Sequence, residues 1–187
     1  LSWKDLAKPE YRNRLGYFSS SNGDGAPRLF GLAEGFGWDL LKSYAASRPL
    51  RVVSPQVLTQ VLESGERAIG FLQNDNIAVR SKAQGKPTGY LFPKEGVPSE
   101  PGGIGLIAKS ARPTAGALFL EWWMSKEGQT LMAKGAKYAT RRDIDPPEGT
   151  PPLSELKLLH IDYAKYGRER LKILGQMAAI FGGDWGD

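Results

Sequence analysis

Residues 15–27 read Leu15-Gly16-Tyr17-Phe18-Ser19-Ser20-Ser21-Asn22-Gly23-Asp24-Gly25-Ala26-Pro27, and this stretch decides the fold. Its apolar start predicts a short strand, and its hydroxyl and glycine residues predict a loop. Pro27 predicts the first turn of a helix, because a helix start leaves an N–H unbonded that proline does not have. The free N–H groups of such a helix start, together with the serine hydroxyls, favour a negatively charged group. Ser, Asn, Asp and Gly are also ordinary turn residues, so a purely structural loop is the alternative.

The segments around this stretch alternate between strand-like and helix-like patterns. We expect strands over residues 15–18, 50–53, 66–72, 88–93 and 103–108. We expect helices over residues 28–33, 37–46, 55–64 and 77–84, from Pro113, after Ser125, and over most of the chain beyond Pro152. This alternation predicts an α/β fold in which helices cover the faces of a sheet.

A second polar cluster, Gln73-Asn74-Asp75-Asn76, follows directly after the expected strand 66–72. In open α/β sheets, ligands lie at the carboxyl ends of the strands. The cluster is therefore a candidate ligand site, and an ordinary turn is the alternative because Asn and Asp are common turn residues.

Composition excludes several classes of protein. The chain has 187 residues and 41% apolar residues, enough for one domain or two small lobes with a real core. The net charge is +5, but the basic residues are scattered among acids, so we expect no nucleic-acid partner. The absence of cysteine excludes disulfides, thiolate zinc sites and cysteine nucleophiles. The first residue is Leu1, not methionine, and we expect a processed or truncated piece of a longer protein.

Residues that could carry catalysis are scarce. His160 is the only histidine, it falls on an expected helix, and nothing near it supplies a nucleophile or a second base. The serine loop lacks a Gly-x-Ser-x-Gly pattern, and no phosphate-binding P-loop motif occurs. Asp24 and Asp75 are scattered carboxylates and form a weak signal for a cation. We therefore predict no catalytic residue, no metal site and no cofactor.

Two further parts of the chain are interpreted as structural and not as functional. Trp122 and Trp123 are expected to pack in the core, because each would bury a large apolar area. The tail over residues 182–187 is expected to be loose.

Short motifs from Ser2 to Phe181 follow one another in an order that resembles a known family. They are Ser2-Trp3-Lys4-Asp5-Leu6 with Pro9, Gly65-Glu66-Arg67-Ala68-Ile69-Gly70, Gly85-Lys86-Pro87, Pro93-Lys94-Glu95-Gly96, Ser125-Lys126-Glu127-Gly128-Gln129 and Tyr138-Ala139-Thr140-Arg141-Arg142-Asp143. The series is similar to the second lobe of periplasmic solute-binding proteins of ABC importers, in the type 2 cluster that contains ferric-ion, thiamine and polyamine binders. The resemblance covers nearly the whole chain and makes residues 138–143 the family's arginine-bearing strand.

The resemblance implies a periplasmic binding protein-like type II fold that contains the second lobe and returning C-terminal helices. It implies lobe two over residues 1–102, a segment returning to lobe one over 103–150, and a helical segment over 151–187 that packs back on lobe two. The first lobe would precede this stretch, so we expect this piece alone to bind solute poorly. A clamp of this kind closes by a hinge motion on its solute and then docks on a membrane permease.

The resemblance also assigns ligand contacts to the two polar segments. The candidate ligand-binding residues are Ser19, Ser20, Ser21, Asn22, Gly23 and Asp24 in the serine loop, and Gln73, Asn74 and Asp75 after the next strand. Ferric binders of the family usually place adjacent tyrosines in the second segment, and this chain has none between Leu72 and Asn76. Amides and hydroxyls suit a polar organic solute or an oxyanion.

The leading hypothesis is therefore a non-enzymatic, periplasmic solute-binding component of an ABC importer, monomeric at full length, that holds a small polar or anionic solute. One alternative is a ferric-ion binder that uses a synergistic anion on the serine loop. Another is an enzyme on a related α/β scaffold, and a last one is an interaction domain that docks on a permease without a ligand.

Overall fold

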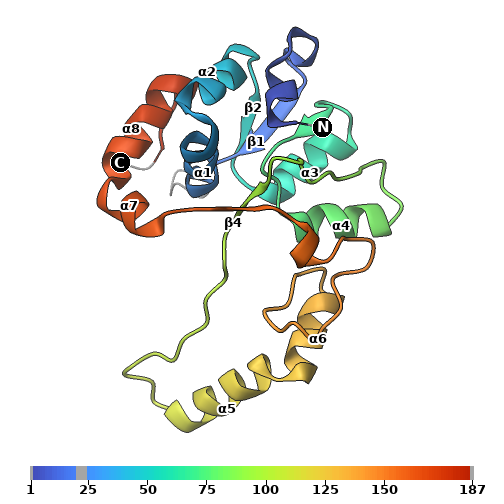
Figure 1. The fold of residues 1–187 in the computed structure, drawn as a ribbon, viewed down its shortest axis with the longest axis vertical. Helices are drawn as coiled ribbons and strands as arrows, with labels where there is room; N and C mark the ends of the chain where they lie inside the picture. The colour runs from blue at the N-terminus through green and yellow to red at the C-terminus, as the bar shows by residue number, and fades with distance from the viewer. Residues whose placement is uncertain (1, 20–24, 186–187) are drawn as a thin grey trace. The chain divides into compact units, whose positions relative to one another are not determined.

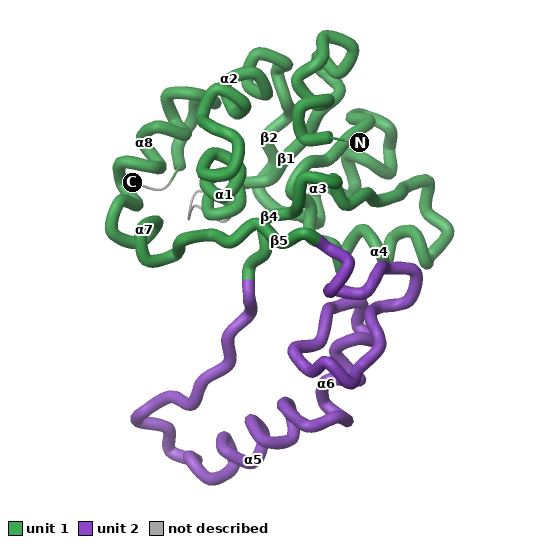
Figure 2. The backbone as a smooth tube through the Cα atoms, viewed as in Figure 1, with its two compact units in different colours: residues 1–100, 157–187 green, residues 101–156 purple. Residues whose placement is uncertain are grey.

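The computed structural model describes residues 2–19 and 25–185 and divides the chain into two compact units (Figures 1 and 2). Unit 1 comprises residues 1–100 and 157–187, and unit 2 comprises residues 101–156. The divisions that the resemblance implies, after residues 102 and 150, stay a prediction. No helix among the described residues is long and apolar enough to cross a membrane.

Unit 1 is built on a parallel sheet of three strands in the order β2-β1-β3. The strands are β1 (Leu15–Phe18), β2 (Leu50–Val52) and β3 (Ile69–Gly70), with Gly16 opposite Leu50 and Leu15 opposite Ile69. The central strand β1 is buried along its whole length, as expected for a parallel strand covered on both faces. β3 is shorter than predicted because Leu72 has a φ of 58° and turns the chain out of the sheet.

Helices cover both faces of this sheet, as predicted (Figure 1). The helices α1 (Ala26–Phe36), α2 (Trp38–Ala46) and α8 (Arg170–Phe181) pack on one face, and α3 (Pro55–Glu63) packs on the other. α4 (Asp75–Ala83) packs on α3, and α7 (Tyr163–Arg168) packs on α1 and α8. Short 3-10 helices η1 (Trp3–Ala7) and η2 (Pro9–Tyr11) precede the sheet. Pro27 lies in the first turn of α1, as predicted, and Gly37 separates α1 from α2 with a φ of 86°. The predicted cap of α3 is also confirmed, since the Ser54 hydroxyl accepts a hydrogen bond from the Val57 N–H at 3.2 Å.

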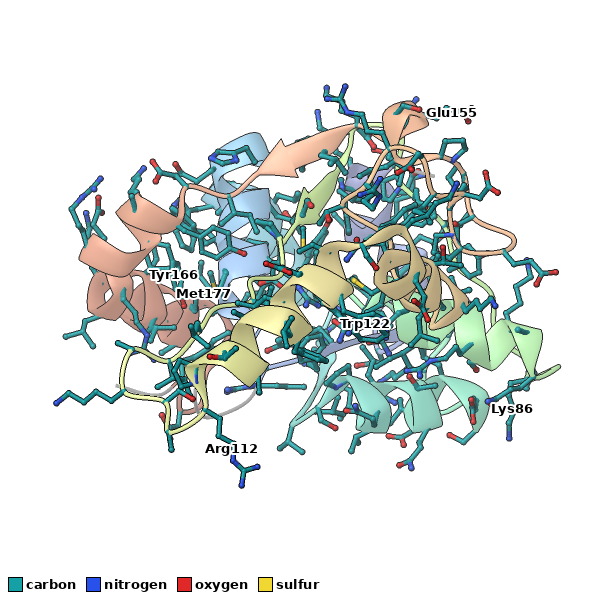
Figure 3. The ribbon with its side chains drawn as sticks, turned by 90° about the horizontal axis from the view of Figure 1, so that it is seen from below. Lys86, Arg112, Trp122, Glu155, Tyr166 and Met177 are labelled. Atoms are coloured by element: carbon teal, nitrogen blue, oxygen red, sulfur yellow. The ribbon has the colours of Figure 1, made fainter. Side chains whose placement is uncertain are left out.

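The main core lies between β1 and the helices α1, α2 and α8, and it includes Tyr166 and Met177, labelled in Figure 3. Leu15 and Tyr17 of β1 belong to this core, whereas Phe18 packs with the residues of α3. Trp185 also belongs to the core and is 1% exposed, so the expectation of a loose tail is wrong up to this residue. The sequence pattern does not predict this burial, because the indole contacts the rings of Tyr17 and Phe181 only in the folded chain.

A second parallel pair, β4 (Val97–Ser99) with β5 (Leu158–His160), also belongs to unit 1. The sequence predicts a loop at β4 and helix at β5, so His160 lies on a strand and not on a helix. Both strands are three residues long, too short for a periodic pattern. Each forms only because the other, about 60 residues away along the chain, supplies its hydrogen-bond partners. The chain leaves unit 1 just after β4 and re-enters it just before β5.

Two predicted strands, over residues 88–93 and 103–108, are irregular in the structure. Among the described residues, neither segment has a neighbouring strand that could satisfy its backbone groups. Residues 138–143, which the resemblance makes a strand, are also irregular, and Arg141 there pairs with Asp143 at 2.8 Å.

Unit 2 contains α5 (Pro113–Met124), α6 (Lys126–Lys134) and the short 3-10 helix η3 (Leu153–Glu155). The Ser125 cap of α6 is confirmed by its hydrogen bond from the Gly128 N–H at 3.3 Å. The expectation that Trp122 and Trp123 pack in a core is wrong, because α5 contains no buried residue and Trp122 is 37% exposed (Figure 3). The two indoles instead contact Phe119 within their own helix, Trp123 stacked on its ring and Trp122 tilted against it.

Candidate functional site

The candidate site lies at the carboxyl edge of the three-stranded sheet, where Ser19 follows β1 and Asn74 follows β3. These two strands are neighbours, so the sheet brings together one residue from each predicted ligand segment. The backbone N–H of Ser19 donates to the Val52 carbonyl at 2.9 Å, and the Ser19 carbonyl accepts from Arg51 Nε at 3.3 Å. Both contacts fix Ser19 at the end of the sheet.

The Ser19 side chain is a buried polar side chain. The residue is 2% exposed, and its hydroxyl finds no hydrogen-bond partner among the described residues. A buried hydroxyl without a partner carries a desolvation cost that a bound ligand can offset. The other loop candidates, Ser20, Ser21, Asn22, Gly23 and Asp24, lie outside the described residues, so their role stays a prediction.

Arg28 binds the end of β3 from the first turn of α1. Its Nη1 donates to the Asn74 side-chain oxygen at 2.5 Å and to the Leu72 carbonyl at 3.2 Å, and its Nε donates to a Glu100 carboxylate oxygen at 2.5 Å. The guanidinium also lies over the Phe18 ring at 5.2 Å, which packs it against the end of β1. A single cation thus joins the last residue of β1 to the residues that follow β3 and β4.

Gln73 and Asp75, the neighbours of Asn74, have partners within the fold. Gln73 Nε2 donates to the Pro55 carbonyl and to the Thr59 hydroxyl, both at 2.9 Å, which ties the end of β3 to α3. One carboxylate oxygen of Asp75 accepts from the Asn76 N–H at 2.8 Å, in the first turn of α4. Their predicted contacts with a ligand stay predictions.

Tyr163, at the start of α7, completes the cluster beside Glu100. Burial and the adjacent Glu100 carboxylate raise the pKa of Tyr163 to about 12. The phenol therefore stays protonated at neutral pH and can donate a hydrogen bond. The cluster contains one cation, one carboxylate, one amide and one phenol, all in unit 1.

Sequence reasoning missed Arg28, Glu100 and Tyr163. One signal was available for Arg28, because a cation in the first turn of a helix opposes the helix dipole unless acceptors hold it. Glu100 and Tyr163 gave no comparable signal, since they follow strand β4 and strand β5, which the sequence does not predict.

Other parts of the described chain contain fewer groups that could bind a polar ligand. A groove of about 540 Å³ lies between α2 and α8, and Lys42 is its only charged lining residue. Lys42 is paired with Asp39 at 2.8 Å. Within residues 2–19 and 25–185, no group of three or more His, Asp or Glu side chains is placed to hold a metal ion.

Comparisons with known proteins agree with this architecture. The profile of a family described as bacterial extracellular solute-binding protein matches residues 37–143, more than half of the chain. A Haemophilus influenzae protein described as uncharacterized is 27% identical over 175 residues, which cover 88% of this chain and 50% of that protein. The chain thus spans about half the length of this curated relative.

Two solved structures share the fold. The substrate binding protein of an ABC transporter from Agrobacterium tumefaciens matches with a TM-score of 0.68 and 20% identity, over 92% of this chain and 55% of that one. Iron-bound HitA from Pseudomonas aeruginosa matches with a TM-score of 0.69 and 18% identity, over 96% of this chain and 60% of that one. The predicted α/β fold of the periplasmic binding protein type is confirmed.

Proposed function

This chain belongs to the bacterial extracellular solute-binding protein family, and we propose on that basis that it serves as the extracytoplasmic solute-binding component of an ABC importer. The proposal includes a small polar or anionic solute, a periplasmic location, a monomeric full-length protein and an ABC permease as partner. It assigns the chain no catalytic step, since the family to which it belongs consists of binding proteins.

One observation carries the proposal: at the carboxyl edge of the sheet, Arg28 binds the residues after β3 and lies over the last residue of β1, Phe18, which precedes the buried, unpartnered Ser19. Ligands of open α/β sheets bind at this edge. A guanidinium, an amide and a hydroxyl supply the directed hydrogen bonds that a small polar or anionic solute needs. Ser20, Ser21, Asn22, Gly23 and Asp24 remain part of the proposed site because they connect Ser19 to α1 along the chain.

Thermal unfolding of the full-length protein against a panel of anions, amino acids, polyamines and ferric complexes tests this proposal. A true solute at a hundredfold excess over its Kd should stabilise the protein by about 2.7 kcal/mol. Ser19→Ala should weaken that stabilisation, and Ser43→Ala, on the outer surface of α2, should leave it unchanged. Turnover of a compound without saturable binding of any panel member would refute the proposal.

A second candidate, ferric import, draws support from the likeness to HitA, whose solved structure is iron-bound. In this version a synergistic anion on the serine loop would hold the ion. One feature of the chain weighs against direct coordination by these residues: the segment from Leu72 to Asn76 contains no tyrosine, whose phenolate oxygen suits a ferric ion. A charge-transfer absorption band on adding ferric ion to the full-length protein would favour this candidate, and a colourless sample would dismiss it.

A further inference from the structure

Glu100 is paired with Arg28, the cation that binds the residues after β3 in the candidate site. Its carboxylate lies 2.5 Å from Arg28 Nε, and the two side chains are 27% and 20% exposed. This pair is therefore more enclosed than Lys165 with Glu34, whose side chains are 36% and 37% exposed at a separation of 2.8 Å. Enclosed charge pairs are screened less by salt, so the partner that Arg28 selects matters energetically.

The guanidinium of Arg28 is held in place independently of Glu100. The Leu72 carbonyl and the Asn74 side-chain oxygen both accept from Nη1, and the Phe18 ring lies beneath the group. Leu72 has a φ of 58°, a left-handed conformation that is uncommon for a branched residue. These contacts orient the arginine, and they leave the Nε side for an acidic group. In this structure the acidic group comes from the protein itself.

We propose that Glu100 takes the place of an acidic group of the solute, and that a solute carrying a carboxylate or phosphate binds by displacing Glu100 from Arg28. This inference deepens the proposed function, on which it rests, by naming the solute class and the residue that controls its entry. Arginine suits both groups, because its planar fork binds carboxylate and phosphate oxygens in pairs.

Displacement makes Glu100 a determinant of specificity. Exchanging the carboxylate of Glu100 for one from solution is unfavourable, because the free anion loses translational and rotational freedom, so an anion that makes only this contact does not displace Glu100. A solute that also satisfies the buried Ser19 hydroxyl gains an additional interaction that Glu100 does not offer. Glu100 thereby selects against simple anions and in favour of solutes with a second polar group.

The Glu100→Gln variant tests the inference, because it preserves the shape of the side chain and removes its charge. Inorganic phosphate and citrate are titrated into the unaltered full-length protein and into this variant by calorimetry. We expect both probes to bind the variant at least about tenfold more tightly, since a competing charge pair has been removed. Combining Arg28→Gln with Glu100→Gln should abolish the gain. Glu34→Gln removes the charge of the more exposed pair with Lys165 and should leave the affinities unchanged.

Affinities in the Glu100→Gln variant that are equal to or below those of the unaltered protein would overturn the inference. The Arg28 Nε–H resonance gives a second reading that does not depend on the variant. Excess phosphate should shift it in the unaltered protein, and a resonance that phosphate leaves in place would also overturn the inference. Failure of the proposed function would give a different result. In that case no solute of the wider panel would stabilise the unaltered protein, whatever the Glu100→Gln variant binds.

Discussion

Arg28 Nη1 lies 2.5 Å from the side-chain oxygen of Asn74 and so joins the first turn of α1 to the start of α4. Asn74 is the N-cap residue of α4, and an asparagine there usually accepts from the N–H groups of its own helix. Its side chain makes no such capping bond here. The Asn74 oxygen instead accepts from Arg28, and this contact holds both side chains at the edge of the sheet.

We predict that Asn74→Ala lowers the free energy of unfolding by about 1–2 kcal/mol, because a hydrogen bond to a charged, partly buried group is lost. Of the two acceptors that Nη1 has among the described residues, the Leu72 carbonyl would remain. Urea denaturation measures the change. Gln60→Ala, on the exposed face of α3, is the control and should change stability by less than about 0.5 kcal/mol. Equal effects of the two substitutions would contradict the prediction.

Trp185 should contribute more to stability than any tryptophan of α5. Its indole is 1% exposed, stacks near Tyr17 and lies under Arg51, whose guanidinium carbon is 4.3 Å from the ring centroid. Trp185→Ala should therefore cost about 3–5 kcal/mol, the range for deleting a buried aromatic side chain. Trp122→Ala, at a 37% exposed position, should cost clearly less in the same thermal unfolding experiment. A loss at Trp185 no larger than at Trp122 would show that the tail does not pack as described.

The parallel pair β4–β5 depends on a glycine at residue 96. Gly96 has a φ of 117°, and a Cβ atom there would lie 2.8 Å from the Lys157 carbonyl oxygen. Gly96→Ala should therefore destabilise unit 1 by about 1–3 kcal/mol through backbone strain. Gly167→Ala is the matched control, because open space surrounds that position in α7 and alanine should stabilise the helix by about 0.5–1 kcal/mol. Amide hydrogen exchange at Val97, whose N–H donates to the Lys157 carbonyl at 2.9 Å, reports the change directly.

Tyr163 should titrate late at high pH. Its pKa is raised to about 12 in the folded protein by burial and by Glu100, against an ordinary value of 10.0. Because the folded state binds the proton more tightly, the associated stability is fully present below pH 10 and is lost as the pH rises towards about 12. Ring-labelled tyrosine NMR follows the midpoint, and Glu100→Gln should move it downwards. A midpoint near 10 in the unaltered protein would contradict the proximity of the two groups.

Local signals explain which elements the sequence predicts well. Pro27 and Ser54 mark helix starts through bonds made within a few residues, and both starts are confirmed. The strands β4 and β5 have no comparable local signal, since their pairing joins Val97 to Leu158. Pro98 in the middle of β4 also argues against a strand in the sequence, because proline is rare within sheets.

The residues of the candidate site also divide into those with a local sequence signal and those without one. Ser19 and Asn74 can be proposed from the sequence because polar residues that follow strands are a general signal in α/β folds. Glu100 and Tyr163 cannot, because they reach the site only through the unpredicted pair β4–β5. The interpretation of Trp122 as core failed for a related reason: large aromatic residues predict burial, but the partner surface is not encoded within a helix.

The most direct test of solute binding at this edge compares Arg28→Gln with Arg80→Gln, using the panel solute that stabilises the unaltered protein most. Arg80 lies on α4, and its Nε donates to the Asn76 carbonyl of its own helix at 3.2 Å. Calorimetry should show that Arg28→Gln weakens binding by about 10–100-fold, as expected for losing a charged hydrogen-bond donor, while Arg80→Gln leaves the Kd unchanged. Equal affinities of the two variants would place the solute elsewhere on the protein.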